Sequence, residues 1–160
     1  MRKKFQSQIG ALWWLASISR PDIYYAVHRC SKLQNKPTKI LGKCIEKILF
    51  YLAATKNFGI VYERKPTDTP ILSGFVDAAF ATEDENFLSR VGYFYFFKGN
   101  LVSWNSENPS RVMTSSTEAE CRGLVHFAKE NLWHRQFHSE LKLFSMKIQQ
   151  LFLRIIFLQS

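Results

Sequence analysis

The sequence predicts an α/β protein in two parts: a three-helix segment, then a three-stranded antiparallel sheet with a long helix. Apolar residues recur at helical spacing three times before residue 55. After Gly59 they form short runs separated by turn residues, and a long helical pattern follows residue 115. With 160 residues, of which 46% are apolar and 15% aromatic, the chain can bury a core in one domain, or in a small domain with an appendage.

The first part is expected to be three packed helices. One helix is predicted over residues 6–19 and ends before Arg20-Pro21, because the residue before a proline avoids helical geometry. The proline then suits the first turn of a second helix. A break at residues 35–38 precedes a third helix, predicted over residues 38–54, which has the clearest apolar periodicity in the chain and a lysine-rich outer face.

The second part begins after a polar, proline-bracketed connector at residues 65–70, which is the predicted boundary. Three strands are predicted, over residues 71–77, 91–97 and 101–104. Lys98-Gly99-Asn100 has hairpin chemistry and joins the last two strands. The middle strand is aromatic at nearly every position, so it is expected to be an inner strand covered on both faces.

A long helix and a tail complete the chain. Ser115, Ser116 and Thr117 offer a hydroxyl cap, and the helix is predicted to run to about residue 141. Residues 141–160 contain no Asp, Glu, Gly or Pro. Their pattern fits a strand followed by an apolar tail and equally an amphipathic helix.

The charge and cysteine content limit the class of protein. A formal charge of +9 favours a polyanionic partner, nucleic acid before an acidic membrane surface, with a solvated basic surface as the alternative. The three cysteines, Cys30, Cys44 and Cys121, are far apart and lack a CxxC pair, which predicts buried, reduced thiols in an intracellular protein of the cytoplasm or nucleus. No apolar run reaches the ~18 residues of a membrane span, so no membrane association is expected.

One carboxylate stands out. Asp77 ends an apolar run and is followed by the small residues Ala78 and Ala79. If the first strand is central and the long helix crosses it, Asp77 meets Glu118 or Glu120 at one end. Converging carboxylates bind Mg²⁺ or Mn²⁺ and suit phosphodiester hydrolysis by two metals roughly 4 Å apart. Spacing alone favours the alternative, in which the glutamates only complement a helix N-terminus.

Several segments, in order over residues 9 to about 141, resemble the C-terminal part of a copia-type LTR retrotransposon polyprotein, where the reverse transcriptase ends and its ribonuclease H domain begins. The most specific are RPDI with YAV at residues 20–27 and SSTEAE at residues 115–120, and FVDAAFA at residues 75–81 also matches. The resemblance implies that residues 1–64 are the helical end of the reverse transcriptase. It also implies that residues 71–141 are a truncated, incomplete ribonuclease H-like fold, and residues 142–160 a divergent apolar tail.

The resemblance also implies a chemistry, Mg²⁺-dependent hydrolysis of RNA in RNA–DNA hybrids. The family's strand-one aspartate falls on Asp77 and its helix glutamate on Glu120, both catalytic and metal-binding, with Glu118 the less favoured neighbour. Its third carboxylate, on the next strand, is missing because no acidic residue follows Glu140. We therefore expect a degenerate fragment with Mg²⁺ binding weak or lost and no cleavage.

Two other functions stay open from the sequence. One is a non-catalytic basic module that binds RNA–DNA hybrid or other nucleic acid, and the other is a pseudogene product without function. The sequence makes no prediction of the oligomeric state.

A second group of polar residues lies on the long helix. His126, Glu130, His134 and His138 recur every four residues and share one helix face. A histidine pair at this spacing can bind Zn²⁺, but without an HExxH order or a nearby cysteine a packing role is favoured. The neighbouring Trp133 and Phe137 are expected in the core.

Overall fold

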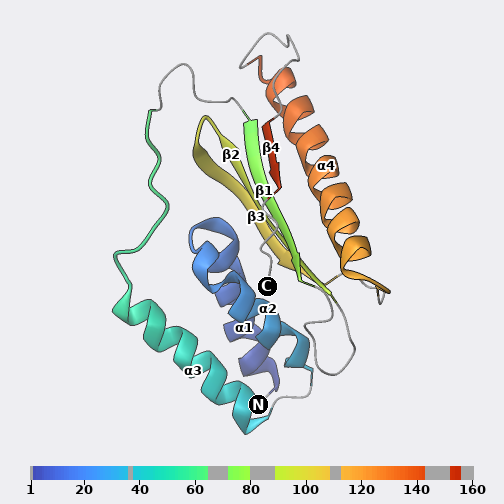
Figure 1. The fold of residues 1–160 in the computed structure, drawn as a ribbon. Coiled ribbons are helices and arrows are strands. Elements are labelled where there is room, and N and C mark those ends of the chain that lie inside the picture. The colour runs from blue at the N-terminus through green and yellow to red at the C-terminus, as the bar shows by residue number, and fades with distance from the viewer. Residues whose placement is uncertain are drawn as a thin grey trace. The chain divides into compact units, whose positions relative to one another are not determined.

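A computed structural model describes residues 2–35, 38–64, 72–79, 89–108 and 113–142, with the backbone of 152–155 (Figure 1). The chain forms two compact units, Met1–Val61, here called the helical unit, and Tyr62–Ser160, here called the sheet unit. The predicted connector and Ile71 lie outside the described residues. Among the described helices, none has the length and apolar content that crossing a membrane requires.

The first unit contains the three predicted helices. They are α1 (Arg2–Ile18), α2 (Tyr24–Leu33) and α3 (Lys39–Ala54), with a short 3₁₀ helix, η1 (Pro21–Ile23), before α2. The second helix therefore opens as a tighter turn than predicted, because the Ile23 N–H bonds to the Arg20 carbonyl three residues back, at 3.3 Å. Buried apolar residues from all three helices form one core, made of Ile9, Leu12, Ala16, Ile23, Val27, Cys30, Leu41, Ile45 and Ile48.

The start of α3 shows how the sequence sets a helix boundary. Thr38 has extended backbone, and its hydroxyl oxygen accepts a hydrogen bond from the Leu41 N–H at 3.2 Å. This satisfies one of the amide groups that the first turn leaves unpaired. The predicted boundary at residue 38 is confirmed.

The second unit is a four-stranded sheet with a long helix on one face (Figure 1). The strand order is β3-β2-β1-β4. β1 (Leu72–Ala79), β2 (Arg90–Phe97) and β3 (Asn100–Glu107) are antiparallel, as predicted, and α4 (Ser116–Glu140) follows them. β4 (Phe152–Ile155) pairs parallel with β1, so this part of the tail is a strand.

The β2–β3 hairpin has the expected turn. Lys98 and Gly99 have φ values of 49° and 72°, and Phe97 pairs with Asn100 across them. Two positive φ values in a two-residue loop match the twist of antiparallel strands. The Asn100 side chain also holds the backbone of Glu63, donating to its carbonyl at 2.9 Å and accepting from its N–H at 2.8 Å.

The expectation that β2 is covered on both faces is wrong for the described residues. Val91, Tyr93 and Tyr95 are buried on the side of α4, whereas Phe94, on the opposite face, is 46% exposed. The aromatic composition of β2 predicts burial on both faces. In the structure only alternate residues of the strand point towards α4. The core on the α4 side is made of Leu72, Val76, Val91, Tyr93, Tyr95 and Phe127.

Some single-residue expectations also fail. Cys30 is buried as predicted, but Cys44 and Cys121 are exposed. Trp133 and Phe137 are 56% and 42% exposed and stack on each other outside the core. These four residues lie on exposed sides of their helices, and the type of a residue does not by itself show which side of a helix it occupies.

Candidate functional site

Asp77 lies near the end of β1, two residues before the strand finishes. Alternate residues of this strand are buried on the side of α4, namely Leu72, Gly74 and Val76. Asp77 belongs to the other set and is exposed. Its Oδ1 atom accepts a hydrogen bond from the Ala78 N–H at 2.9 Å. The carboxylate is therefore accessible from solvent.

Glu120 lies in the second turn of α4, close to the point where this helix meets β1. A Cβ atom at Gly123 would lie 3.2 Å from Val76 Cγ2 and 3.8 Å from Ala78 Cβ, so the helix approaches the strand closely because Gly123 has no side chain. Glu120 precedes Gly123 by three residues, shares its strip of the helix and is half-buried. Ala78 faces this strip, whereas its neighbour Asp77 faces away from it.

Glu118 has a structural role. Its Oε2 atom accepts hydrogen bonds from the Thr114 N–H at 2.8 Å and from the Thr114 hydroxyl at 2.9 Å. Its own N–H donates to the Ser115 hydroxyl oxygen at 3.1 Å. Ser115 and Glu118 together cap the start of α4.

β4 lies beside β1 on the side opposite β2. The two are parallel, and Val76 pairs with Ile155. The sequence of β4, FLRI, contains Arg154 and no carboxylate. Within the described residues, no group of three or more His, Cys, Asp or Glu side chains is placed to hold a metal ion.

Two histidines of α4, His134 and His138, pack against the sheet. The His134 ring stacks on Tyr95 with centroids 4.3 Å apart, and His138 stacks on Phe97 at 4.5 Å. Both histidines are buried, and neither ring nitrogen of His134 has a hydrogen-bond partner. Burial lowers the pKa of His134, although the Glu130 carboxylate, with Oε1 3.7 Å from Nε2, opposes this shift. The neutral ring is the form that packs.

The sequence did not reveal the buried hydrogen bond beside these rings. The Tyr95 hydroxyl donates to Asn131 Oδ1 at 2.6 Å, and both residues are buried. Burial raises the pKa of Tyr95, and it raises the pKa of Tyr93 to about 12. Asn131 lies four residues after Phe127 and three before His134, on the same side of α4. This spacing was the one signal in the sequence that Asn131 would be buried.

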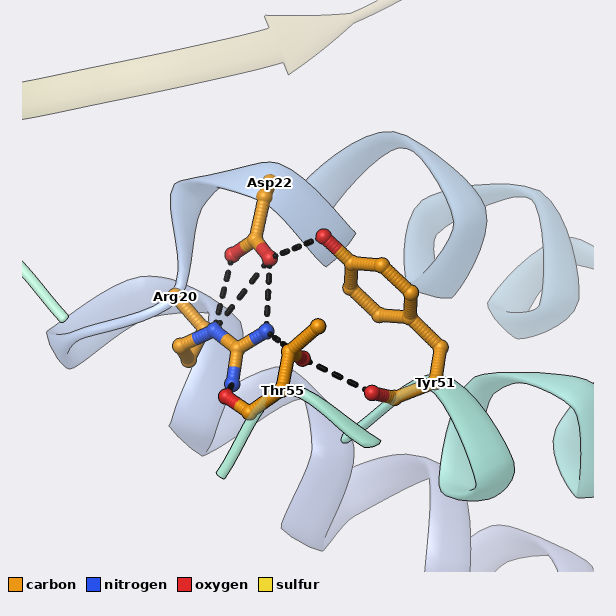
Figure 2. A network of polar contacts seen from close by, with 4 residues as sticks. All are labelled: Arg20, Asp22, Tyr51 and Thr55. Carbon is orange, nitrogen blue, oxygen red and sulfur yellow. Dashed lines mark hydrogen bonds and ion pairs between the residues drawn. The ribbon is translucent and has the colours of Figure 1, made fainter. Parts of the chain in front are cut away.

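A second polar network lies within the helical unit (Figure 2). The Arg20 guanidinium donates to both carboxylate oxygens of Asp22, at 2.7–3.2 Å. It also donates to the carbonyl and hydroxyl oxygens of Thr55, at 3.0 and 2.7 Å. The Tyr51 hydroxyl donates to Asp22 at 2.9 Å. The hydrogen bonds between these two side chains lower the pKa of Asp22 and raise the pKa of Arg20.

The hydrogen bonds of this network connect the turn before α2 with the end of α3. Arg20 is buried, so its charge needs the partners that Asp22 and Thr55 supply. The residues of the RPDI motif therefore have a structural role in this chain.

Comparison with known proteins places the chain among transposon-encoded polyproteins. The Retrovirus-related Pol polyprotein from transposon RE1 of Arabidopsis thaliana is 35% identical over 138 residues, covering 86% of this chain and 9% of that protein. The Pol polyprotein from transposon TNT 1-94 of Nicotiana tabacum is 33% identical over 139 residues, 87% of this chain and 10% of that protein. Secreted RxLR effector protein 161 of Plasmopara viticola is 32% identical over 129 residues, 81% of this chain and 89% of that protein.

These relatives define the class. The chain belongs to the retrovirus-related Pol polyprotein family of copia-type retrotransposons, which confirms the resemblance seen in its motifs. It spans about a tenth of the length of those polyproteins. No family model matches the chain, and no solved structure gives a significant match.

Proposed function

We propose that the chain is a degenerate fragment of the reverse transcriptase and ribonuclease H part of such a polyprotein, and that it does not cleave RNA. The order of elements supports this proposal: an aspartate near the end of β1, a glutamate early in α4 and a parallel strand beside β1. One observation carries the inactivity. The parallel strand paired with β1, where the resemblance places the third carboxylate, contains Arg154 and no carboxylate, and residues 141–160 contain no Asp or Glu.

The chemistry needs more ligands than Asp77 and Glu120 supply. Two-metal hydrolysis uses one ion to activate water and the other to stabilise the leaving oxygen, and both ions must be fixed by oxygen ligands. Mg²⁺ held by two carboxylates keeps most of its water and is bound weakly. Loss of one member of a cooperating ligand set lowers the rate by orders of magnitude.

A cleavage assay tests the proposal. The purified chain is incubated with a labelled RNA–DNA hybrid and Mg²⁺ or Mn²⁺, beside an Asp77→Asn variant. We expect the two proteins to give the same background. Metal-dependent cleavage by the unchanged chain that disappears in Asp77→Asn would show that the remaining carboxylates suffice.

The distribution of charge favours a second candidate function, non-catalytic nucleic-acid binding. Residues 1–61 contain 11 of the 22 Lys and Arg residues but only two of the 13 acidic residues, Asp22 and Glu46. Residues 62–160 contain 11 cations and 11 acids. The whole formal charge of +9 therefore resides in the helical unit. On the exposed side of α3, Lys39, Lys43 and Lys47 recur every four residues.

Salt titration tests this candidate. Neutralised phosphates release counterions, so hybrid binding by the helical unit should weaken steeply as salt increases. Lys43→Glu combined with Lys47→Glu should weaken binding and flatten the salt dependence. Lys129→Glu, an exposed cation of the sheet unit, is the control and should change little. An equal loss in both variants would argue against the helical unit as the binding surface.

A further inference from the structure

The helix α4 is apolar on two opposite sides. One side packs on the sheet through Ala119, Gly123 and Phe127. The other side carries a second apolar set, here called the outer ridge, in which successive residues are four, three and four positions apart: Cys121, Val125, Ala128 and Leu132. All four are exposed, Val125 at 53% and Leu132 at 63%.

This spacing is that of a helix–helix seam. Apolar residues alternating at three and four positions keep one stripe facing a partner helix along several turns. A surface helix ordinarily has a polar outer side, and one that is apolar all round is ordinarily buried.

The charges around the ridge determine which helix would fit. Arg122 and Lys129 lie along one side of it, and Arg135 follows Leu132 by three positions at its end. Within the described part of the chain none of the three forms an ion pair. The acidic residues near its two ends are engaged locally: Glu118 accepts from Thr114, and Glu140 accepts from the Gln136 amide at 3.0 Å. The ridge is therefore apolar, with a basic side at Arg122 and Lys129 and a basic end at Arg135.

A second copy of the chain fits this surface poorly. If the ridges of two antiparallel copies are matched, Cys121 against Leu132, Arg122 of one copy lies within two positions of Lys129 of the other, and like charges beside a helix seam are destabilising.

We propose that the outer ridge docks an acidic amphipathic helix of a different protein segment. Its apolar residues would repeat at spacings of four, three and four, and Asp or Glu would flank them. The apolar seam supplies the contact area, and the cations Arg122, Lys129 and Arg135 select acidic over basic partners.

Two synthetic helical peptides test the proposal with the full chain. Both have leucines at the matching spacing, one with glutamates at the flanks and the other with lysines, and fluorescence anisotropy measures their binding. The glutamate peptide should bind at least about tenfold tighter than the lysine peptide. Leu132→Asp should abolish this binding. Arg122→Glu combined with Lys129→Glu should reverse the preference between the peptides.

A matched control is Ile40→Asp, on α3 of the helical unit, where the residue is 71% exposed. It should leave peptide binding unchanged, and circular dichroism should show every variant folded, because the substituted residues lie outside the cores. Equal binding of both peptides, no binding of either, or binding that survives Leu132→Asp would each overturn the proposal. So would a dimer of the unchanged chain that Leu132→Asp dissociates, because the occupant would then be a second copy.

Discussion

At Gly74 the backbone of β1 passes directly against the ring of Phe127. A Cβ atom there would overlap this ring, which is almost fully buried, and would lie 3.0 Å from the Phe94 carbonyl oxygen. Gly74→Ala should therefore lower the free energy of unfolding by about 1–3 kcal/mol, as overpacked cores do. Urea denaturation followed by circular dichroism measures the change.

Gly10 provides the matched control for this substitution. It lies inside α1, and a Cβ atom there would meet nothing within 4 Å. Gly10→Ala should raise the free energy of unfolding by about 0.5–1 kcal/mol, because alanine restricts the unfolded chain and favours the helix. A Gly74→Ala variant as stable as Gly10→Ala would mean that Phe127 does not pack on β1 as described.

His134 makes the sheet unit sensitive to acid. Its pKa in the folded chain is lowered from the ordinary value of 6.5, chiefly by burial, so below that value the unfolded chain binds a proton that the folded chain resists. The free energy of unfolding should be level above about pH 7 and should fall as the pH drops from about 6.5 towards 5. Glu130 and His138 on α4 and Tyr95 on β2 are the titratable groups that face the ring.

Two variants isolate this contribution. His134→Phe keeps a ring against Tyr95 and should remove most of the decrease between pH 6.5 and 5. His126→Gln changes a half-exposed histidine, whose Nδ1 lies 3.0 Å from Glu107 Oε1, and should retain the decrease. Denaturant midpoints recorded across this pH range compare them. An unchanged acid profile in His134→Phe would assign the sensitivity to another group.

At the scale of elements, the Arg20 network joins η1 to the end of α3. Arg20→Met leaves the Asp22 carboxylate without its cation and the Thr55 oxygens without their donor. Because the Asp22 side chain is 33% exposed and partly screened, we expect a loss of about 2 kcal/mol rather than the larger cost of a fully buried pair. Thermal and urea unfolding measure this loss.

Tyr51→Phe is the graded comparison. It removes only the hydroxyl that donates to Asp22, and it should cost about 1 kcal/mol or less. Combining Arg20→Met with Asp22→Asn should cost less than the sum of the two single changes, since neither charge is then left alone. Strictly additive losses would show that the two side chains do not interact in solution.

Elements with local causes were predictable from the sequence. The Thr38 cap and the Lys98-Gly99 turn depend on residues within a few positions of each other, and both are found. The pairing of β4 with β1 joins residues about eighty positions apart, and the pattern of the tail did not distinguish a strand from a helix. The exposure of Phe94 on β2 was not predicted, because the burial of a strand residue depends on which other elements pack against its face and not on the composition of the strand.

The candidate site was predictable only in part. The resemblance to the retrotransposon family selected Asp77 and Glu120, whereas spacing alone favoured a structural role, and the absence of acids in residues 141–160 is visible in the sequence. Their positions on different sides of β1 follow from strand alternation combined with the approach of α4 at Gly123, and that approach needs the packed structure. The roles of Glu118 as a cap and of His134 as a packed neutral ring likewise depend on partners distant in sequence or on burial.

At the scale of the whole molecule, the two units differ in charge, and they should therefore differ in their response to salt. The helical unit has eleven cations against two acids, so its cations repel one another, whereas the sheet unit is balanced. Increasing salt shortens the screening distance from about 10 Å at 0.1 M to about 3 Å at 1 M and weakens this repulsion. Sodium chloride should therefore raise amide-exchange protection in α1, α2 and α3 more than in β1, β2 and β3.

Charge reversal within the helical unit gives the comparison. Lys39→Glu combined with Lys43→Glu lowers the excess of cations without touching the core, so it should raise protection of α1–α3 at low salt and reduce the further gain from added salt. Hydrogen-exchange mass spectrometry of the full chain reads both units in one experiment, and the sheet unit serves as the internal reference. An equal response to salt in both units would mean that the charge carried by residues 1–61 does not limit the stability of the helices.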